Sequence, residues 1–541
     1  MLTSPHPAVE IPALALADFV LEHAREWADH PALVDATNGR VVSYGRLADQ
    51  VDRVAAGFAA WGVRPGEAVG VFSPNVVEYP AVFLGVTRAG AVNTTINALA
   101  TADEAAQQLC RVRARLLVAD AALADRALPA AAQAGVEIFS VGAMPGATRV
   151  EELLERPGQP PSVAIDPATQ LASLPCSSGT TGLPKGVMLT HRNLVANIAQ
   201  SLPGLALDAD DVVIAVLPFS HIYGQTVVMN CSLRAGATIV TMPRFELEAF
   251  LATIEHDRVT RAFVAPPIVL ALAKNALVDG CDLSSLAQVF SGAAPLGAEL
   301  AEEASRRLGC PVVQGYGLTE ASPVLTLVPR GGPNRPGSIG PLVPNTEGRI
   351  VQPGTLEDVA PGQAGELLAR GPQVMLGYLD DPQATEAAMV QGGWLRTGDV
   401  VQADPDGWLT VVDRAKELIK YKGYAIAPAE LEALLVTHPA VADACVVGVP
   451  DVEAGEIPKA FVVVRDELDP DALLAWVAER VAPYKRVRLV ETIEEIPKSP
   501  SGKILRRVLA ERGTAADPNG NTPTHGEAVR ERRDSNPRPP A

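Results

Sequence analysis

The sequence predicts an α/β protein with a large, multi-lobed N-terminal domain containing βαβ sheets and a small α+β C-terminal domain. Apolar runs of strand length alternate with helix-length amphipathic segments, and this order of elements changes in the last quarter of the chain. The length of 541 residues is too great for one ordinary domain. With 48% hydrophobic and 20% charged residues, the composition is that of a globular protein, which excludes wholesale disorder.

The first half of the chain alternates helix and strand signals. Residues 44–61 place apolar side chains at steps of three and four, which predicts an amphipathic helix. Residues 77–90 and 193–200 are further helix-like segments. Short apolar runs predict strands at 68–73, 114–120, 171–176, 211–219 and 237–245. Strands separated by helix-length segments indicate βαβ units and parallel sheets.

The last quarter predicts a small α+β domain that begins near Asp413. From residue 513 onward the chain has almost no apolar residues, so 513–541 are predicted to be a disordered tail. Helices are predicted at 428–438 and about 470–481, and strands at 444–450 and 460–466.

Charge and cysteine content narrow the function classes. A net charge of −18 argues against binding nucleic acid through its phosphate backbone. The six cysteines lie far apart with no CxxC pair, so a disulfide framework and a zinc ribbon are not expected and a reducing compartment is favoured. The first residues lack a basic signal-peptide region, and no apolar stretch is long enough for a membrane span. A soluble cytoplasmic protein is therefore expected.

The strongest local signal is SSGTTGLPKG, Ser177 to Gly186, which lies between a strand-like and a helix-like segment. Its glycines and hydroxyl residues offer many N–H and O–H donors, and Lys185 adds a positive charge, so the loop suits a polyphosphate. The lysine is spaced differently from that of the P-loop pattern. A flexible surface linker is the alternative, but a linker gains nothing from the flanking strand and helix.

This loop resembles the phosphate-loop signature of the adenylate-forming enzymes, which include acyl-CoA synthetases, peptide-synthetase adenylation domains and beetle luciferases. Six further segments resemble the later motifs of the superfamily, in order: LPFSHIYG at 217–224, SGAAPL at 291–296, QGYGLTE at 314–320, GWLRTGDV at 393–400, DRAKELIKYKGY at 413–424 and PKSPSGKILRR at 497–507. Within the superfamily, the first and fifth of these segments, together with APAELEALL at 427–435, look most like the 4-coumarate:CoA ligase branch.

The resemblance implies a carboxylic acid–CoA ligase that uses ATP, Mg²⁺ and CoA. In such an enzyme the acid attacks the α-phosphorus of ATP, pyrophosphate leaves, and a thiol then displaces AMP from the acyl-adenylate. Because both steps develop charge on oxygen atoms, positioned cations and hydrogen-bond donors should dominate catalysis. The acid is expected to be aryl or phenylpropanoid-like (4-coumarate or cinnamate-like) or of medium chain length. The alternatives are an adenylating enzyme that loads a carrier-protein phosphopantetheine, a medium- or long-chain fatty acyl-CoA synthetase, and a catalytically silent nucleotide-binding protein.

The resemblance also implies a nucleotide site. Tyr316 is expected to stack on adenine, Thr319 to contact the α-phosphate, and Glu320 to bind Mg²⁺, which prefers oxygen ligands. Asp399 is expected to take both ribose hydroxyls. Alone, the Thr-Glu pair would more often mark a helix start, and this aspartate a turn. The other residues expected at ATP are Ser177, Ser178, Gly179, Thr180, Thr181, Gly182, Lys185, Gln314, Gly315, Arg414, Lys416 and Lys420.

The C-terminal domain is implied to be mobile, with Lys416 as the pivot whose dihedrals change between the two half-reactions. Lys503 is expected to reach the carboxylate and α-phosphate during adenylation, and Lys420 to face the site after the domain rotates. Arg244, Lys422 and Gly423 are expected to contact CoA. The implied parts are the N-terminal domain 1–412, the hinge 413–416, the C-terminal domain 417–512 and the tail 513–541.

The acyl pocket departs from the coumarate ligase pattern. The serine expected at Val227 and the lysine often found at Phe290 are replaced by apolar residues. Burying an unpaired phenolic hydroxyl there would cost about 1–3 kcal/mol, so we predict a weaker preference for 4-hydroxylated acids. The usual glutamine after the KGY triplet is Ala425. His221 is either an aromatic gate beside the carboxylate or a buried core histidine. The implied pocket lining is Tyr223, Val227, Phe290, Ala293, Gly315, Gly317, Pro323, Val324 and Leu327.

Overall fold

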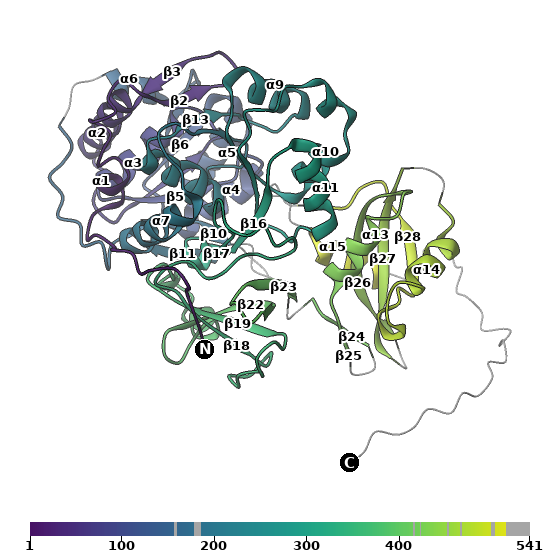
Figure 1. Cartoon of the computed structure of the whole chain (residues 1–541). Helices are drawn as coiled ribbons and strands as arrows, with labels where there is room; N and C mark the ends of the chain where they lie inside the picture. Colours follow the sequence, from purple (N-terminus) through teal and green to yellow (C-terminus); the bar gives the residue numbers. More distant parts are fainter. Residues whose placement is uncertain are drawn as a thin grey trace, which may run out of the picture.

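The computed structural model describes residues 1–155, 159–177, 185–414, 417–421, 424–451, 454–465, 468–498 and 504–514. Figure 1 shows a large body that ends with β23 and a smaller, yellow-green body formed by the elements that follow it. The predicted α/β class, with a large N-terminal and a smaller C-terminal domain, is confirmed.

The first sheet of the large body is mainly parallel and has the strand order β10-β11-β9-β5-β4-β6-β7-β8, with β20 paired to β11. Every residue of β4 and β5 is buried, as expected for strands covered on both faces by helices. The strands are β4 (Ala68–Phe72), β5 (Val92–Ile96), β6 (Leu116–Asp120), β7 (Glu137–Val141), β8 (Thr148–Arg149), β9 (Leu171–Ser173), β10 (Cys176–Ser177), β11 (Lys185–Thr190) and β20 (Gly377–Tyr378). The helices that alternate with them are α2 (Tyr44–Ala60), α3 (Tyr79–Arg88), α4 (Ala102–Arg111), η1 (Ala121–Leu123), α5 (Ala124–Ala134) and α6 (Val150–Glu155).

The second sheet has the order β17-β16-β15-β14-β12-β13-β2-β3 and is parallel from β16 to β2. Its strands are β2 (Pro31–Asp35), β3 (Val41–Ser43), β12 (Val212–Ala215), β13 (Thr238–Thr241), β14 (Arg261–Val264), β15 (Gln288–Ser291), β16 (Val312–Gly317) and β17 (Val324–Leu327). The helices near it are α1 (Leu16–Val20), α7 (His191–Leu205), the π-helix η2 (Gly224–Cys231), α8 (Ser232–Ala235), α9 (Leu247–Asp257), α10 (Pro266–Lys274), η3 (Ala276–Gly280), α11 (Ala298–Leu308) and η4 (Thr319–Ala321).

An antiparallel sheet and then a mixed sheet follow, and the chain passes from one to the other between Arg414 and Ile419. In the mixed sheet β28 pairs with β27 in parallel, whereas the other pairs are antiparallel. The third sheet contains β1 (Leu2–Thr3), β18 (Glu347–Val351), β19 (Gly365–Arg370), β21 (Met389–Val390), β22 (Trp394–Ala403) and β23 (Leu409–Arg414), with α12 (Pro382–Ala388) beside it. The smaller body contains β24 (Ile419–Tyr421), β25 (Tyr424–Ile426), β26 (Val441–Asp451), β27 (Gly455–Val464), β28 (Leu489–Thr492), α13 (Pro428–Leu435), α14 (Pro470–Ala478), η5 (Pro483–Lys485) and α15 (Arg506–Thr514).

The predicted strand at 211–219 is correct only in its first half, because β12 ends at Ala215. The Asn75 side chain donates to the carbonyl oxygens of Ala215 and Leu217 and accepts from the N–H of Phe219. This distant side chain takes the backbone groups that a continuing strand would need, so the chain turns toward η2 instead. The predicted tail also begins too early, since α15 includes Gly513 and Thr514; residues 515–541 lie outside the described residues.

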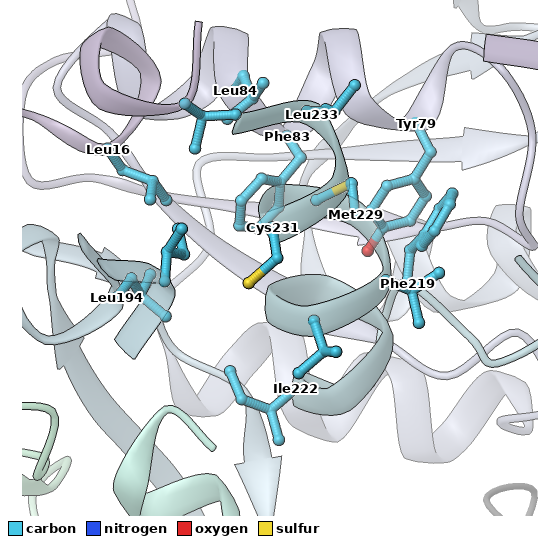
Figure 2. Close-up of a cluster of buried hydrophobic side chains, with 14 of the residues drawn as sticks. Leu16, Tyr79, Phe83, Leu84, Leu194, Phe219, Ile222, Met229, Cys231 and Leu233 are labelled. Atoms are coloured by element: carbon cyan, nitrogen blue, oxygen red, sulfur yellow. The ribbon is translucent and has the colours of Figure 1, made fainter. Parts of the chain in front are cut away.

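The largest core cluster surrounds η2. Figure 2 shows Met229 and Cys231 of η2 packed among Tyr79, Phe83 and Leu233. Gly224 begins the π-helix, and a Cβ built on it would lie 2.1 Å from the carbonyl oxygen of Pro218. Only glycine therefore lets η2 approach the preceding turn, and this contact places the segment that carries His221 and Tyr223.

His191 at the start of α7 predicts a loss of stability in mild acid. Its Nδ1 accepts the Leu16 N–H at 3.0 Å, and burial lowers its pKa to about 4. The unfolded chain would bind a proton below its usual pKa of about 6.5 while the folded chain stays neutral. The contribution of His191 to the free energy of unfolding is thus present above the unfolded pKa of about 6.5. It falls as the pH drops toward 4, by about 2 kcal/mol between pH 7 and 5.

The measurement is urea unfolding at several pH values for the wild-type protein, for His191→Gln and for His256→Gln, whose side chain is exposed. Between pH 7 and 5 the free energy of unfolding should fall by about 2 kcal/mol more in the wild type than in His191→Gln. His256→Gln should show the same pH dependence as the wild type. Equal slopes for wild type and His191→Gln would refute the assignment.

No helix among the described residues is both long enough and apolar enough to cross a membrane.

Candidate active site

Three of the sequence motifs meet at one edge of the second sheet. SGAAPL begins at the carboxyl end of β15, QGYGLTE runs along β16 into η4, and LPFSHIYG follows β12. These strands are parallel, so their carboxyl ends lie at the same edge. In open α/β sheets ligands bind at this edge, and the motifs therefore form one candidate site.

The strand pair β10–β11 flanks the predicted phosphate loop. Ser177 is paired with Lys185 and Cys176 with Gly186 in antiparallel register, so the two ends of the loop lie side by side. The predicted phosphate contacts Ser178, Gly179, Thr180, Thr181 and Gly182 lie outside the described residues. β11 then pairs with β20, which brings Val187 opposite Tyr378.

Lys185, Tyr378 and Glu320 form a cluster beside the phosphate loop. The Tyr378 hydroxyl donates to Glu320 Oε1 at 2.8 Å, and Lys185 Nζ lies 5.0 Å from the centre of the Tyr378 ring. Burial, assisted by the neighbouring Glu320 charge, raises the pKa of Tyr378 well above its usual value. The hydroxyl therefore remains a protonated donor to the carboxylate.

A second pair involves Tyr316 of the QGYGLTE motif. The Tyr316 hydroxyl donates to Asp399 Oδ2 at 2.5 Å, and Asp399 is only 6% exposed. In the antiparallel β22–β23 pair, Asp399 stands opposite Arg414. The structure thus places Tyr316, expected at adenine, beside Asp399, expected at the ribose, although the two residues are far apart in the sequence.

Magnesium fits the donor set at Glu320. Oε1 accepts the Tyr378 hydroxyl, whereas no described residue donates a hydrogen bond to Oε2. Among the described residues, no group of three or more His, Cys, Asp or Glu side chains could hold a metal. Mg²⁺ commonly binds one or two carboxylates together with substrate phosphates and water, and the Oε2 atom of Glu320 fits this ligand type. Glu320 would supply the protein ligand.

Of the expected acyl-pocket residues, Phe290 lies directly beside Tyr223. The Tyr223 hydroxyl donates to the Phe290 carbonyl oxygen at 3.2 Å, and the Tyr223 ring makes an edge contact with Phe263. Burial raises the Tyr223 pKa well above its usual value, which keeps this donor protonated. A Cβ on Gly315 would lie 2.5 Å from Phe290 Cζ, so the phenyl ring covers that stretch of β16. The Tyr223 hydroxyl is therefore already used by the backbone.

The remaining expected lining residues have mixed placements. Val227 and Val324 are almost fully buried, and Ala293 has a left-handed backbone with φ of 71° in the SGAAPL turn. A Cβ on Gly317 would lie 2.2 Å from the Pro323 carbonyl oxygen, so these two backbone segments touch. Leu327 is buried with its side chain against Gly204 of α7, which places it in the core between β17 and α7.

Three other expected contacts are placed as follows. The Gln314 side-chain amide accepts from the Leu296 N–H and donates to the Leu296 carbonyl, and the Gln314 carbonyl oxygen accepts from the Val328 N–H at 3.0 Å. Thr319 begins η4 directly before Glu320. The His221 Nδ1 accepts from the Tyr223 N–H at 3.3 Å, and the ring is partly exposed rather than buried, which disfavours the core-histidine alternative.

Several expected residues belong to the segments after β23. Lys416, Lys422, Gly423 and Lys503 lie outside the described residues. Lys420 is exposed on β24, where it stands opposite Ala425 of β25. Arg244, expected at CoA, is highly exposed in the turn after β13 and pairs with Glu246 at 2.6 Å.

Tyr378 is the functional candidate that the motif search missed. It lies 58 residues after Glu320 in a short Gly-Tyr strand with no charged or metal-ligating signature. Only the pairing of β20 with β11 reveals its place between the phosphate loop and the carboxylate.

Two family models match this chain. The model of the AMP-binding enzyme matches residues 20–379, and that of the AMP-binding enzyme C-terminal domain matches residues 430–503. Among solved structures, the anthranilate CoA ligase AuaEII in complex with anthranoyl-AMP has a TM-score of 0.86 at 27% identity, covering 93% of this chain and 98% of that one. ATP-bound MatB from Rhodopseudomonas palustris has a TM-score of 0.84 at 27% identity, covering 92% and 99%.

Curated relatives match over nearly the whole chain. The 4-coumarate--CoA ligase 5 of Oryza sativa subsp. japonica is 43% identical over 528 residues, which is 95% of this chain and 97% of the relative. The 4-coumarate--CoA ligase of Pinus taeda is 42% identical over 519 residues, with 94% and 96% covered. The expected resemblance is confirmed: the chain belongs to the AMP-binding enzyme family, and it is an ATP-dependent, AMP-forming acid–thiol ligase.

Proposed function

We propose that this enzyme joins an aryl or phenylpropanoid-like carboxylic acid to CoA through an acyl-adenylate. The observation that carries the proposal is the convergence of Lys185, Glu320 and Asp399, from three distant motifs, around the carboxyl end of β16. The relatives named 4-coumarate--CoA ligase, which match along nearly the whole chain, support both the acid class and CoA as the thiol.

In the first half-reaction a carboxylate oxygen of the acid attacks the α-phosphorus, and the bond to the β-phosphate oxygen breaks to release pyrophosphate. Lys185 and the loop before it would hold the phosphates, and Glu320 would hold Mg²⁺, which neutralises phosphate charge when bound. Asp399 would fix the ribose, and Tyr316 would cover the adenine ring. These groups position the nucleotide in line with the acid.

In the second half-reaction the CoA sulfur loses its proton and attacks the acyl carbon, and AMP leaves. We propose residues 413–416 as the hinge between an N-terminal domain (1–412) and a C-terminal domain (417–512), with Lys416 as pivot. Lys503 would serve adenylation, whereas Lys420 would face the site after rotation, and Arg244, Lys422 and Gly423 would contact CoA. β23, which ends at Arg414, belongs to the third sheet, whereas β24, which begins at Ile419, belongs to the fourth, and this change of sheet supports a hinge between them.

The test is pyrophosphate release with ATP and Mg²⁺ across cinnamic, hydroxycinnamic, benzoic and medium- to long-chain fatty acids, each with and without CoA. We expect acid-dependent release that CoA strongly stimulates. Adenylate formation that ignores CoA would favour a carrier-protein phosphopantetheine as the acceptor. A preference for long-chain acids would favour a fatty acyl-CoA synthetase. Absence of release with every acid would contradict the proposal.

The acyl pocket predicts a higher kcat/KM for cinnamate than for 4-coumarate. Val227 and Phe290 offer no polar side chain, and the Tyr223 hydroxyl already donates to a backbone carbonyl. An unpaired phenolic hydroxyl costs about 1–3 kcal/mol, which corresponds to roughly 5- to 150-fold in kcat/KM. The measurement is kcat/KM for both acids at saturating ATP and CoA. A higher value for 4-coumarate would contradict this specificity.

Val227→Ser tests the physical cause. A hydroxyl at this position should raise the ratio of 4-coumarate to cinnamate, while Val228→Ser, in the same π-helix, serves as the matched control. An unchanged ratio in Val227→Ser would show that this residue does not face the phenyl end of the acid.

We also propose that the enzyme acts in the cytoplasm. The six cysteines, all of which lie in described segments, are free thiols, as a reducing compartment favours. Fractionation of cells that carry the tagged protein at its native level is the test.

A further inference from the structure

The geometry points to Tyr378 as a positioning residue that keeps the metal-binding carboxylate and the phosphate-binding lysine apart and correctly oriented. This inference rests on the proposed nucleotide site and adds to it a residue that carries no charge. Tyr378 touches both Glu320 and Lys185, through different parts of its side chain.

The backbone around Tyr378 is held firmly against the strand that leaves the phosphate loop. The Leu376 N–H donates to the Met188 carbonyl at 3.0 Å, and the Leu379 N–H donates to the Gly186 carbonyl at 2.9 Å. The Tyr378 N–H itself donates to Thr385 Oγ1 at 2.9 Å. The backbone that carries the aromatic ring is thus fixed relative to β11, which begins with Lys185.

The carboxylate end is held as well. The Met375 N–H donates to the Glu320 carbonyl oxygen at 2.9 Å, so the Glu320 backbone is tied to the segment that leads into β20. The phenolic hydroxyl then occupies Oε1 and orients the carboxylate, which leaves Oε2 for an oxygen-liganded cation. Groups that orient a metal ligand in this way typically contribute about 10- to 100-fold to metal affinity.

The ring also stands between opposite charges. Lys185 lies over the ring face and Glu320 accepts the hydroxyl at its edge, and no ion pair joins Lys185 to Glu320 among the described residues. A direct ion pair would neutralise the two groups that phosphate and Mg²⁺ need. The cation–π contact holds the lysine without removing its charge.

The test measures ATP binding to the full-length protein in the absence of acid, by equilibrium titration at several Mg²⁺ concentrations. Tyr378→Phe keeps the ring and removes the hydroxyl, so the Mg²⁺ concentration needed for half-maximal enhancement of ATP binding should rise about 10-fold. ATP affinity without Mg²⁺ should remain that of the wild type. Tyr378→Leu removes the ring too and should also weaken Mg²⁺-free ATP binding, by about 10-fold.

Tyr79→Phe is the matched control, because the buried Tyr79 hydroxyl has no hydrogen-bond partner among the described residues. It should leave both titrations unchanged, and thermal unfolding should show that all variants are folded. Wild-type Mg²⁺ dependence in Tyr378→Phe would overturn the inference while leaving the proposed function intact. A wild-type protein that binds ATP without any Mg²⁺ effect would overturn the nucleotide-site assignment and this inference together.

Discussion

Replacing Lys503 by alanine is expected to slow adenylate formation by about 10²- to 10³-fold, the usual effect of removing one group that stabilises transition-state charge. Thioester formation from supplied acyl-adenylate and CoA should continue at nearly the wild-type rate. The reason is that Lys503 is proposed to stabilise charge on the carboxylate and α-phosphate only in the first half-reaction. The measurement is single-turnover kinetics of each half-reaction.

The residues that follow Lys503 in the sequence provide the control. Arg506 begins α15 and is anchored by ion pairs to Glu417, directly after the proposed hinge, and to Glu432. Arg507 is the next residue on the helix, is largely exposed and faces Glu511. Arg507→Ala removes a nearby positive charge without disturbing this anchor and should leave both half-reactions intact. Equal slowing of both half-reactions in Lys503→Ala would contradict the assigned role.

Replacing Asp399 by alanine is expected to weaken ATP binding by about 100-fold. A hydrogen bond to a charged group contributes about 1.5–3 kcal/mol, and this carboxylate is proposed to accept from the ribose hydroxyls. Tyr316→Phe removes only the hydroxyl that donates to Asp399 Oδ2 and keeps the ring beside the adenine position, so its effect should be below about tenfold. Equilibrium binding of ATP with Mg²⁺ measures both.

Asp358→Asn is the control for Asp399→Ala, because Asp358 is an exposed partner of Arg349 elsewhere on the large body. Its ATP affinity should equal that of the wild type. A stronger effect of Tyr316→Phe than of Asp399→Ala would show that the tyrosine, not the carboxylate, makes the dominant nucleotide contact.

Secondary structure was predictable wherever local periodicity and local capping agree. The helix predicted at 44–61 is α2, because its apolar stripe is buried and the Ser43 side chain caps its first turn by accepting from the Arg46 N–H. The end of β12 was not predictable, because it depends on hydrogen bonds from Asn75, which lies more than a hundred residues away. Such a partner leaves no trace in the local pattern.

In the candidate site, too, some residues could be predicted from the sequence and others could not. Lys185, Glu320 and Asp399 stand in motifs that resemble those of the adenylate-forming enzymes, and this resemblance made them candidates before the fold was known. Leu327 was expected to line the acyl pocket, yet its side chain packs on Gly204 of α7. Strand direction and helix packing decide which side of β17 faces a ligand, and sequence position alone does not.

By itself the sequence determined the α/β class, the family and the charged groups that the chemistry needs, because these depend on residue type, spacing and order along the chain. Only the tertiary structure decided which of those groups meet. It set Asp399 beside Tyr316 and placed Tyr378 between Lys185 and Glu320. These contacts join strands that are remote in sequence, and their register follows from burying whole sheet faces, which no local segment encodes.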